Sequence, residues 1–161
     1  TASRKRPRPG RREPAVCGGE MMHDQTITLY NYHEPSGLWY TTVFEGVQLA
    51  AASASSATTH GNNGGDSVSI IIPAAADKTA ASRQYIGPKA YAARDAPGEC
   101  FTFWPEHDFV VVGSCPLEQP VSEDDYDNGL YHEMNHGQDG VYIVTSASFY
   151  GLIPHFEVEG R

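Results

Sequence analysis

The C-terminal segment from Gly140 to Arg161 constrains the fold of this chain more than any other part of its sequence. It reads as two closely joined strands, GVYIVTSASFY and IPHFEVEGR, and Gly151 and Pro154 mark the turn between them. Apolar and aromatic residues recur along both strands in the pattern of half-buried antiparallel β structure: Val141, Ile143, Phe149, Ile153, Phe156 and Val158. The sequence therefore predicts a β-hairpin that ties down the C-terminus.

The rest of the chain also reads as a series of short strands. Residues 26–33 and 38–49 flank Glu34-Pro35-Ser36-Gly37, a run of turn formers, which predicts a second hairpin. Shorter strands are expected at SVSIIIP (67–73), FTFW (101–104) and FVVVG (109–113).

Two Gly- or Ala-rich segments separate these strands. Residues 50–66 are small and polar, so we expect a long flexible loop there, and residues 74–99 form an Ala-rich connection with one helical turn at 88–94. Some seven short strands with little helix predict a mainly β fold. We expect a small antiparallel β-barrel or sandwich with long Gly/Ala-rich loops and at most short helical turns.

A chain of 161 residues is about one domain, and its charge is divided unevenly. Residues 1–20 hold six basic and two acidic groups, a balance of +4, whereas residues 21–161 hold five basic and eighteen acidic groups, a balance of −13. We expect residues 1–20 to be a disordered basic tail, and residues 21–161 to form a single β domain. The chain starts without Met while Met21 and Met22 follow Gly-Gly-Glu, so we interpret the tail as translated upstream sequence.

This composition excludes several classes of function. A body of charge −13 should repel nucleic acid, so we expect no specific nucleic-acid recognition. No apolar run approaches the roughly 20 residues of a membrane-spanning helix, so no membrane partner is expected. The Gly-rich run at 61–65 is followed by neither Lys-Ser/Thr nor a helical pattern, and nothing else indicates a cofactor or a small-molecule substrate.

One motif points to metal chemistry. His132-Glu133-Met134-Asn135-His136 satisfies the H-E-x-x-H pattern, in which a helix places two His one turn apart as zinc ligands and the Glu acts as general base. Ser122 could cap a helix that leads into this motif, but residues 125–129 (DYDNG) are poor helix formers. If the helix forms, Tyr126, Leu130 and Met134 define its buried stripe, and both His then face solvent.

A third zinc ligand is also missing from the positions where the pattern requires it. The extended pattern needs Gly at 139 and His at 142, where this chain has Asp139 and Tyr142, and Glu157 lies on an expected strand. We therefore interpret the motif as a solvated acidic loop and expect no catalytic residue and no metal ligand. Adventitious metal binding, and a zinc metallopeptidase with Glu133 as base and His132 and His136 as ligands, remain alternatives.

Several motifs occur in an order that resembles a known family. They are ITLYNYHEPSGLWY followed by Phe44-Glu45-Gly46-Val47, then SVSIIIP, the segment from Tyr85 to Tyr91, FTFWPEHDFVVVG, and VYIVTSASFYGLIPHFEVEGR. From Gln25 to Arg161 the chain resembles small uncharacterised structural proteins of tailed phages and prophages of Gram-positive bacteria. The C-terminal motif of that family corresponds here to Gly151, Pro154, His155, Phe156, Val158 and Gly160.

The resemblance implies a non-enzymatic virion component that is assembled in the cytoplasm of a bacterial host. It implies a head–tail connector or neck subunit, either a stopper or a tail-completion protein, that forms a homo-oligomeric ring on the DNA channel. Its partners would be other phage structural proteins, such as portal, adaptor or tail proteins. The alternative within the same resemblance is a decoration or binding module on the capsid or tail.

Overall fold

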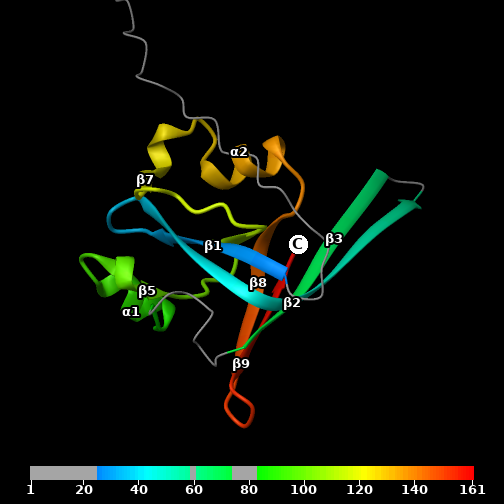
Figure 1. The fold of residues 1–161 in the computed structure, drawn as a ribbon. Coiled ribbons are helices and arrows are strands. Elements are labelled where there is room, and N and C mark those ends of the chain that lie inside the picture. Colours follow the sequence, from blue (N-terminus) through cyan, green and yellow to red (C-terminus); the bar gives the residue numbers. More distant parts are fainter. Residues whose placement is uncertain (1–24, 59–60, 74–82) are drawn as a thin grey trace, which may run out of the picture.

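A computed structural model describes residues 25–58, 61–73 and 83–161 (Figure 1). The expected basic tail at 1–20 and the first part of the Ala-rich connection, residues 74–82, lie outside these ranges. Among the residues that the structure describes, no helix has the length and apolar character needed to cross a membrane.

Six antiparallel strands close into a barrel. They are β1 (Gln25–His33), β2 (Leu38–Thr58), β3 (Gly61–Pro73), β6 (Phe109–Val112), β8 (Val141–Tyr150) and β9 (His155–Gly160). Their order around the barrel is β1-β6-β8-β9-β3-β2, and pairing of β1 with β2 closes the circle. The prediction of a mainly β fold is confirmed, and the structure selects the barrel over the sandwich.

A bulge in β2 lies next to the point where this strand changes its partner from β1 to β3. The register with β1 shifts between Phe44 and Val47, and Gly46 there has a φ of 70°. Glycine adopts such a positive φ without steric cost, and bulges of this kind bend a strand. Beyond the bulge, from Gln48 onward, β2 pairs with β3.

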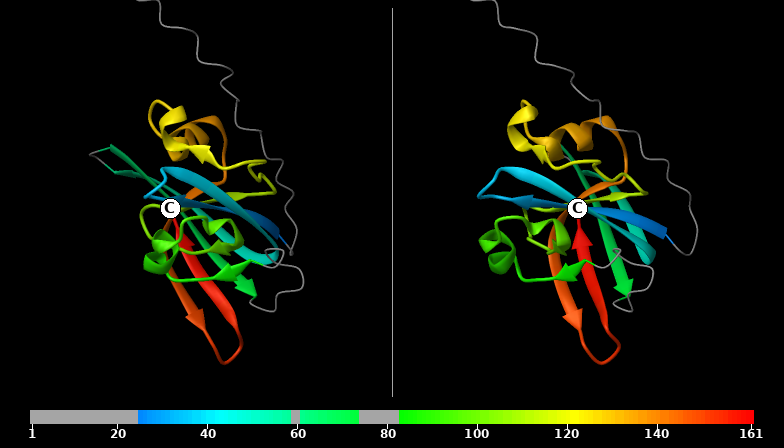
Figure 2. Two further views of the ribbon diagram at one scale, coloured as in Figure 1. Left: turned by 90° about the vertical axis from the view of Figure 1, so that its left-hand side faces the viewer. Right: turned by 60° about the vertical axis from the view of Figure 1, so that its left-hand side comes forward.

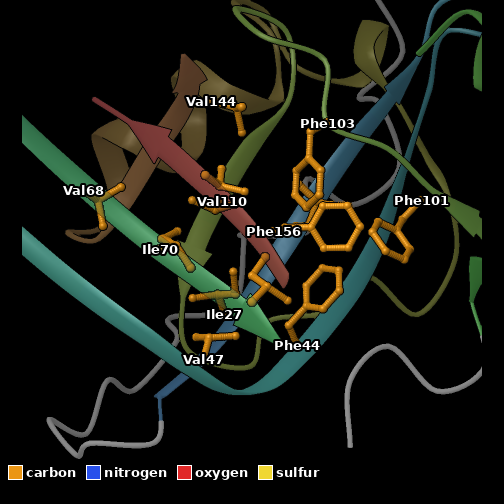
Figure 3. Packing of buried hydrophobic residues seen from close by; sticks show 13 residues of the cluster. Ile27, Phe44, Val47, Val68, Ile70, Phe101, Phe103, Val110, Val144 and Phe156 are labelled. Carbon is orange, nitrogen blue, oxygen red and sulfur yellow. The ribbon is translucent and has the colours of Figure 1, made fainter. Parts of the chain in front are cut away.

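Side chains that alternate along the strands form two hydrophobic clusters, one inside the barrel and one on its outer wall. Ile27, Leu29 and Val110 point into the barrel, whereas Tyr30, Phe109 and Val111 belong to the outer cluster. The interior is filled by aliphatic side chains and by the rings of Phe44, Phe101, Phe103 and Phe156 (Figure 3). A filled interior is expected for a barrel of so few strands.

The outer cluster is covered by β7 (Val121–Ser122), the 3-10 helix η3 (Glu123–Asp125) and α2 (Leu130–Gly137). Ser122 caps η3 by accepting a hydrogen bond from Asp124 N, as its position in the sequence suggested. The long helix considered in the sequence does not form through residues 126–129. Instead α2 begins at Leu130, whose N–H donates to Glu123 Oε1 at 3.0 Å, and the other oxygen of that carboxylate accepts from the Trp39 indole.

Shorter elements gather near one end of the barrel. β4 (Gln84–Tyr85) pairs in parallel with β5 (Cys100–Phe101), and α1 (Pro88–Ala93) and the 3-10 helix η2 (Pro97–Glu99) lie between them in the chain. The helical turn expected at 88–94 is confirmed, with Pro88 opening it. The strand expected at 101–104 is shorter than predicted and ends at Phe101.

The prediction of a flexible loop at residues 50–66 is wrong in the part that the structure describes. Strands β2 and β3 continue through this segment as an antiparallel arm, paired from Gln48 with Ile71 out to Thr58 with Gly61. The arm extends away from the barrel (Figure 1). Small polar residues lack the hydrophobic alternation that marks a strand, but their backbone groups pair as well as those of any other residues.

A buried carboxylate anchors the segment that carries Phe101 and Phe103 to β1. Asp108 is fully buried and accepts hydrogen bonds from Tyr32 N (2.9 Å), Trp104 N (2.8 Å) and Asn31 Nδ2 (2.8 Å). Asn31 Nδ2 also donates to Thr102 O at 2.6 Å. Burial raises the pKa of Asp108 to about 7, although the three N–H donors act in the opposite direction.

We expect Asp108→Ala to lower the free energy of unfolding by roughly 3 kcal/mol or more, because three buried or partly buried N–H groups would lose their acceptor at about 1–3 kcal/mol each. Asp108→Asn keeps one acceptor oxygen and should cost less. Urea denaturation followed by circular dichroism measures both. Asp95→Ala, at an exposed carboxylate, is the control, and equal transition midpoints for Asp108→Ala and this control would refute the anchoring role.

Candidate functional site

The turn of the β8–β9 hairpin projects beyond the barrel (Figures 1 and 2). The two strands pair from Val144 with Gly160 to Tyr150 with His155, which confirms the C-terminal hairpin predicted from the sequence. The barrel holds this hairpin, because β9 pairs with β3 along its whole length and the first residues of β8 pair with β6. The chain therefore ends in the barrel, while the turn at 151–154 lies away from it.

The outer end of this hairpin is apolar and exposed. We call Phe149, Tyr150, Leu152 and Ile153 the apex, and their exposed fractions are 55%, 47%, 98% and 75%. The sequence predicted that Phe149 and Ile153 would be half-buried, and the exposure of both side chains corrects that prediction. The segment from Thr145 to Phe156 contains no Asp, Glu, Lys or Arg. Contiguous exposed apolar side chains of this kind mark interaction sites on soluble proteins.

Aromatic pairs across the two strands support the apex. Phe149 lies opposite Phe156 with ring centroids 5.1 Å apart, and Tyr150 stacks on His155 at 5.1 Å with an angle of 9° between the planes. Phe156 belongs to the barrel interior, so the first pair connects the exposed apex to the core. Cross-strand aromatic pairs stabilise a hairpin, and here they hold the apex in a defined conformation.

Both ring nitrogens of His155 are hydrogen-bonded. Nδ1 lies 2.6 Å from Ile153 O in the turn, and Nε2 lies 3.1 Å from Glu157 Oε1 on the same strand. Both partners are acceptors, so the doubly protonated imidazolium satisfies this arrangement best. The bond to Ile153 O and the Glu157 carboxylate together raise the pKa of His155. Protonated His155 therefore fastens the turn to β9.

The residues of the C-terminal motif divide between the core and the turn. Phe156 and Val158 are buried in the barrel interior, whereas Gly151 and Pro154 form the exposed turn and His155 braces it. Gly160 lies where β9 closes on its neighbours. A Cβ there would lie 2.9 Å from Ile143 O and 3.1 Å from Val68 Cγ1, too close for any other residue without a shift of the backbone. The motif thus describes one hairpin, anchored inside the barrel and exposed at its end.

The H-E-x-x-H motif lies on α2 and not on the loop that we expected. Leu130 and Met134 are buried in the outer cluster, and His132 and His136 are exposed, as the helical stripe predicted. Glu157, the distant candidate for a third ligand, lies on β9 and binds His155. Within the described ranges, no group of three or more His, Cys, Asp or Glu side chains is arranged to hold a metal ion.

The hairpin was predicted from the sequence, but its exposed apex was not. The available signal was the pair Leu152-Ile153 placed between Gly151 and Pro154, where two large aliphatic residues fall in a turn that ordinarily carries polar side chains. Asp108 was also missed, because a single carboxylate between Pro105-Glu106-His107 and a strand looks like part of an exposed turn.

These features define a small closed β-barrel protein whose exposed apolar hairpin is its most prominent candidate binding element. By sequence the chain belongs to a family of unknown function, DUF6751, whose model matches residues 22–161. Neither the curated proteins nor the solved structures include a match to the chain.

Two glycines of the motif should respond differently to the same substitution. Gly160→Ala should lower the free energy of unfolding by about 1–3 kcal/mol, since the new methyl group overpacks the strand crossing. Gly151→Ala is the matched control, because its Cβ would meet only Phe149 Cε1, at an ordinary 3.9 Å. Thermal unfolding compares the two variants, and similar losses in both would contradict the close approach at Gly160.

The His155 brace should depend on pH. Its pKa is raised above the ordinary 6.5, so the brace stabilises the turn below about pH 6.5 and weakens as the pH rises through the folded-state pKa. Glu157→Gln should lower the pKa of His155 in an NMR titration, whereas Glu159→Gln, two residues along the strand, should leave it unchanged. Equal pKa values in all three proteins would show that Glu157 does not hold the ring.

Proposed function

We propose that this protein is a non-enzymatic virion component of a tailed phage, a head–tail connector subunit that forms a ring and binds neighbouring structural proteins through the β8–β9 apex. The observation that carries the proposal is the apex itself, four large apolar side chains exposed at the end of a braced hairpin. The resemblance of the C-terminal motif to phage structural proteins supplies the biological setting.

The apex has the properties of an interface anchor. Burying Leu152 and Ile153 in an apolar pocket would contribute about 1.5–3 kcal/mol for each side chain. Binding also costs the entropy of ordering the groups that make contact, and a hairpin already held by Phe156 and His155 loses less of it. In a typical protein interface, a small number of such anchors contribute most of the binding free energy.

Strand addition, in which a neighbouring protein pairs with an unpaired strand edge, is possible at few places on the barrel. The six barrel strands are paired around a closed circle, so contacts of that kind are confined to the parts of strands that extend beyond it. These are the outer part of β8, from Thr145 to Tyr150, and the β2–β3 arm (Figure 2). From Ser53 to Thr58, β2 is paired in the described residues only with β3, which leaves backbone groups available at its other edge.

The charge of the body suits a position beside DNA rather than attachment to it. Residues 21–161 carry a balance of −13, which repels the phosphate backbone and disfavours specific nucleic-acid recognition. A surface of this sign along a channel lets DNA pass without binding it. The apex, which carries no acidic or basic residue, is separated from that charge and fits an apolar pocket on a partner such as a portal, adaptor or tail protein.

A decoration or binding module on the capsid or tail is the second candidate. The same braced apex supports it, because a single anchored hairpin is enough to attach one copy to a larger assembly. The two functions differ in self-association. A connector subunit forms a ring alone or on a portal-type ring, whereas a decoration module stays monomeric and binds its site one copy at a time.

The proposal is tested by native mass spectrometry of the full chain, alone and with the portal and tail proteins encoded beside it. We expect a closed oligomer such as a hexamer or dodecamer, or a monomer that assembles on a portal-type ring. The double variant Leu152→Asp/Ile153→Asp should abolish the assembly while leaving the circular dichroism spectrum and thermal unfolding unchanged, because both side chains are exposed in the monomer.

The matched control introduces two charges at exposed positions away from the hairpin, Gln48→Asp/Gln119→Asp, and should assemble like the wild type. A stable monomer that binds no phage structural protein would refute the proposal. Assembly that survives the apex substitutions would show that another surface makes the contact.

A further inference from the structure

Helix α2 presents two histidines on one exposed face. His132 and His136 are four residues apart, so they lie one turn apart along the helix. Leu130 and Met134 fix the opposite face in the outer cluster, and Leu130 N is held by Glu123. The helix is therefore anchored on the barrel wall, and the backbone positions of both imidazoles are set before any ligand arrives.

The spacing of the two rings matches a shared metal ion. Their centroids are 4.5 Å apart and their planes meet at 63°. A metal–nitrogen bond of about 2.1 Å places the ion about 3.2 Å from each ring centre, so two ligands at a right angle have centroids about 4.5 Å apart, and two at a tetrahedral angle about 5.2 Å. The observed separation is therefore short enough for two imidazoles that share one ion.

A right angle between two nitrogen ligands is the geometry of neighbouring positions in square-planar or octahedral coordination. Cu²⁺ and Ni²⁺ prefer such arrangements with imidazole ligands, and they bind more tightly than the earlier divalent ions of the first row. Zn²⁺ prefers the tetrahedral angle. The acidic body also raises the local concentration of cations.

We propose that His132 and His136 form a two-histidine site for a late first-row divalent cation, with Cu²⁺ and Ni²⁺ favoured. Two protein ligands leave the remaining coordination positions to water or to a donor from another molecule. The site is distinct from that of a zinc peptidase, because within the described residues no third side chain reaches it. It does not depend on the connector function, since it is built from the helix on the outer wall and not from the apex.

Isothermal titration of the full chain with Ni²⁺ tests the site, with the protein prepared without a histidine tag. We expect saturable binding of one ion per chain, or of one ion per two chains if a second copy completes the coordination. His132→Ala, His136→Ala and the double variant should each lose this binding. All three should keep the wild-type unfolding temperature in the absence of metal, because both side chains are exposed.

The matched control for the single variants removes one histidine from another exposed position, His107→Ala, and should bind Ni²⁺ like the wild type. A Cu²⁺ electron paramagnetic resonance spectrum gives a second measurement, in which coupling to two nitrogens in the wild type should disappear in the double variant. Wild-type binding by His132→Ala/His136→Ala would show adventitious binding elsewhere on the chain and would overturn the proposal.

Discussion

The closure of the barrel through β2 is the constraint on which the rest of the structure depends. This one strand pairs with β1 from Leu38 to Val47 and with β3 from Gln48 onward, and the bulge at Gly46 bends it where its partner changes, so that the sheet closes into a circle. Closure buries the inward faces of six strands against each other and creates the interior that Phe44, Phe101, Phe103 and Phe156 fill. Among the six described barrel strands, it leaves unpaired edges mainly on the outer part of β8 and on the β2–β3 arm.

Much of this fold could be predicted from the sequence where hydrophobic alternation was strong. The patterns at 26–33, 109–113 and 141–158 led to strands that the structure confirms, and Pro88 correctly marked a helical turn. The choice between barrel and sandwich could not be made, because it depends on whether β1 and β2 pair around the bulge. The β2–β3 arm was missed because its small polar residues carry no pattern, and its pairing continues from the barrel part of the same strands.

The candidate site shows a similar division. The hairpin was predicted, but its alternation suggested that Phe149 and Ile153 would be half-buried, whereas both are exposed because the hairpin extends beyond the barrel. The sequence correctly predicted that the histidines of the H-E-x-x-H motif would face solvent if a helix formed. It wrongly favoured a loop over a helix at this motif. Poor propensity at residues 125–129 did end one helix, but Glu123 starts another at Leu130, a contact that depends on tertiary structure.

The filled interior has a consequence for the proposed ring of subunits. Aromatic and aliphatic side chains occupy the space between the six strands, so the individual barrel is a solid building block and not a pore. A ring of these subunits would therefore enclose its central opening between neighbouring molecules. The diameter of that opening would follow from the number of copies and the reach of their hairpins, so one barrel design could serve openings of different widths without any change to its core.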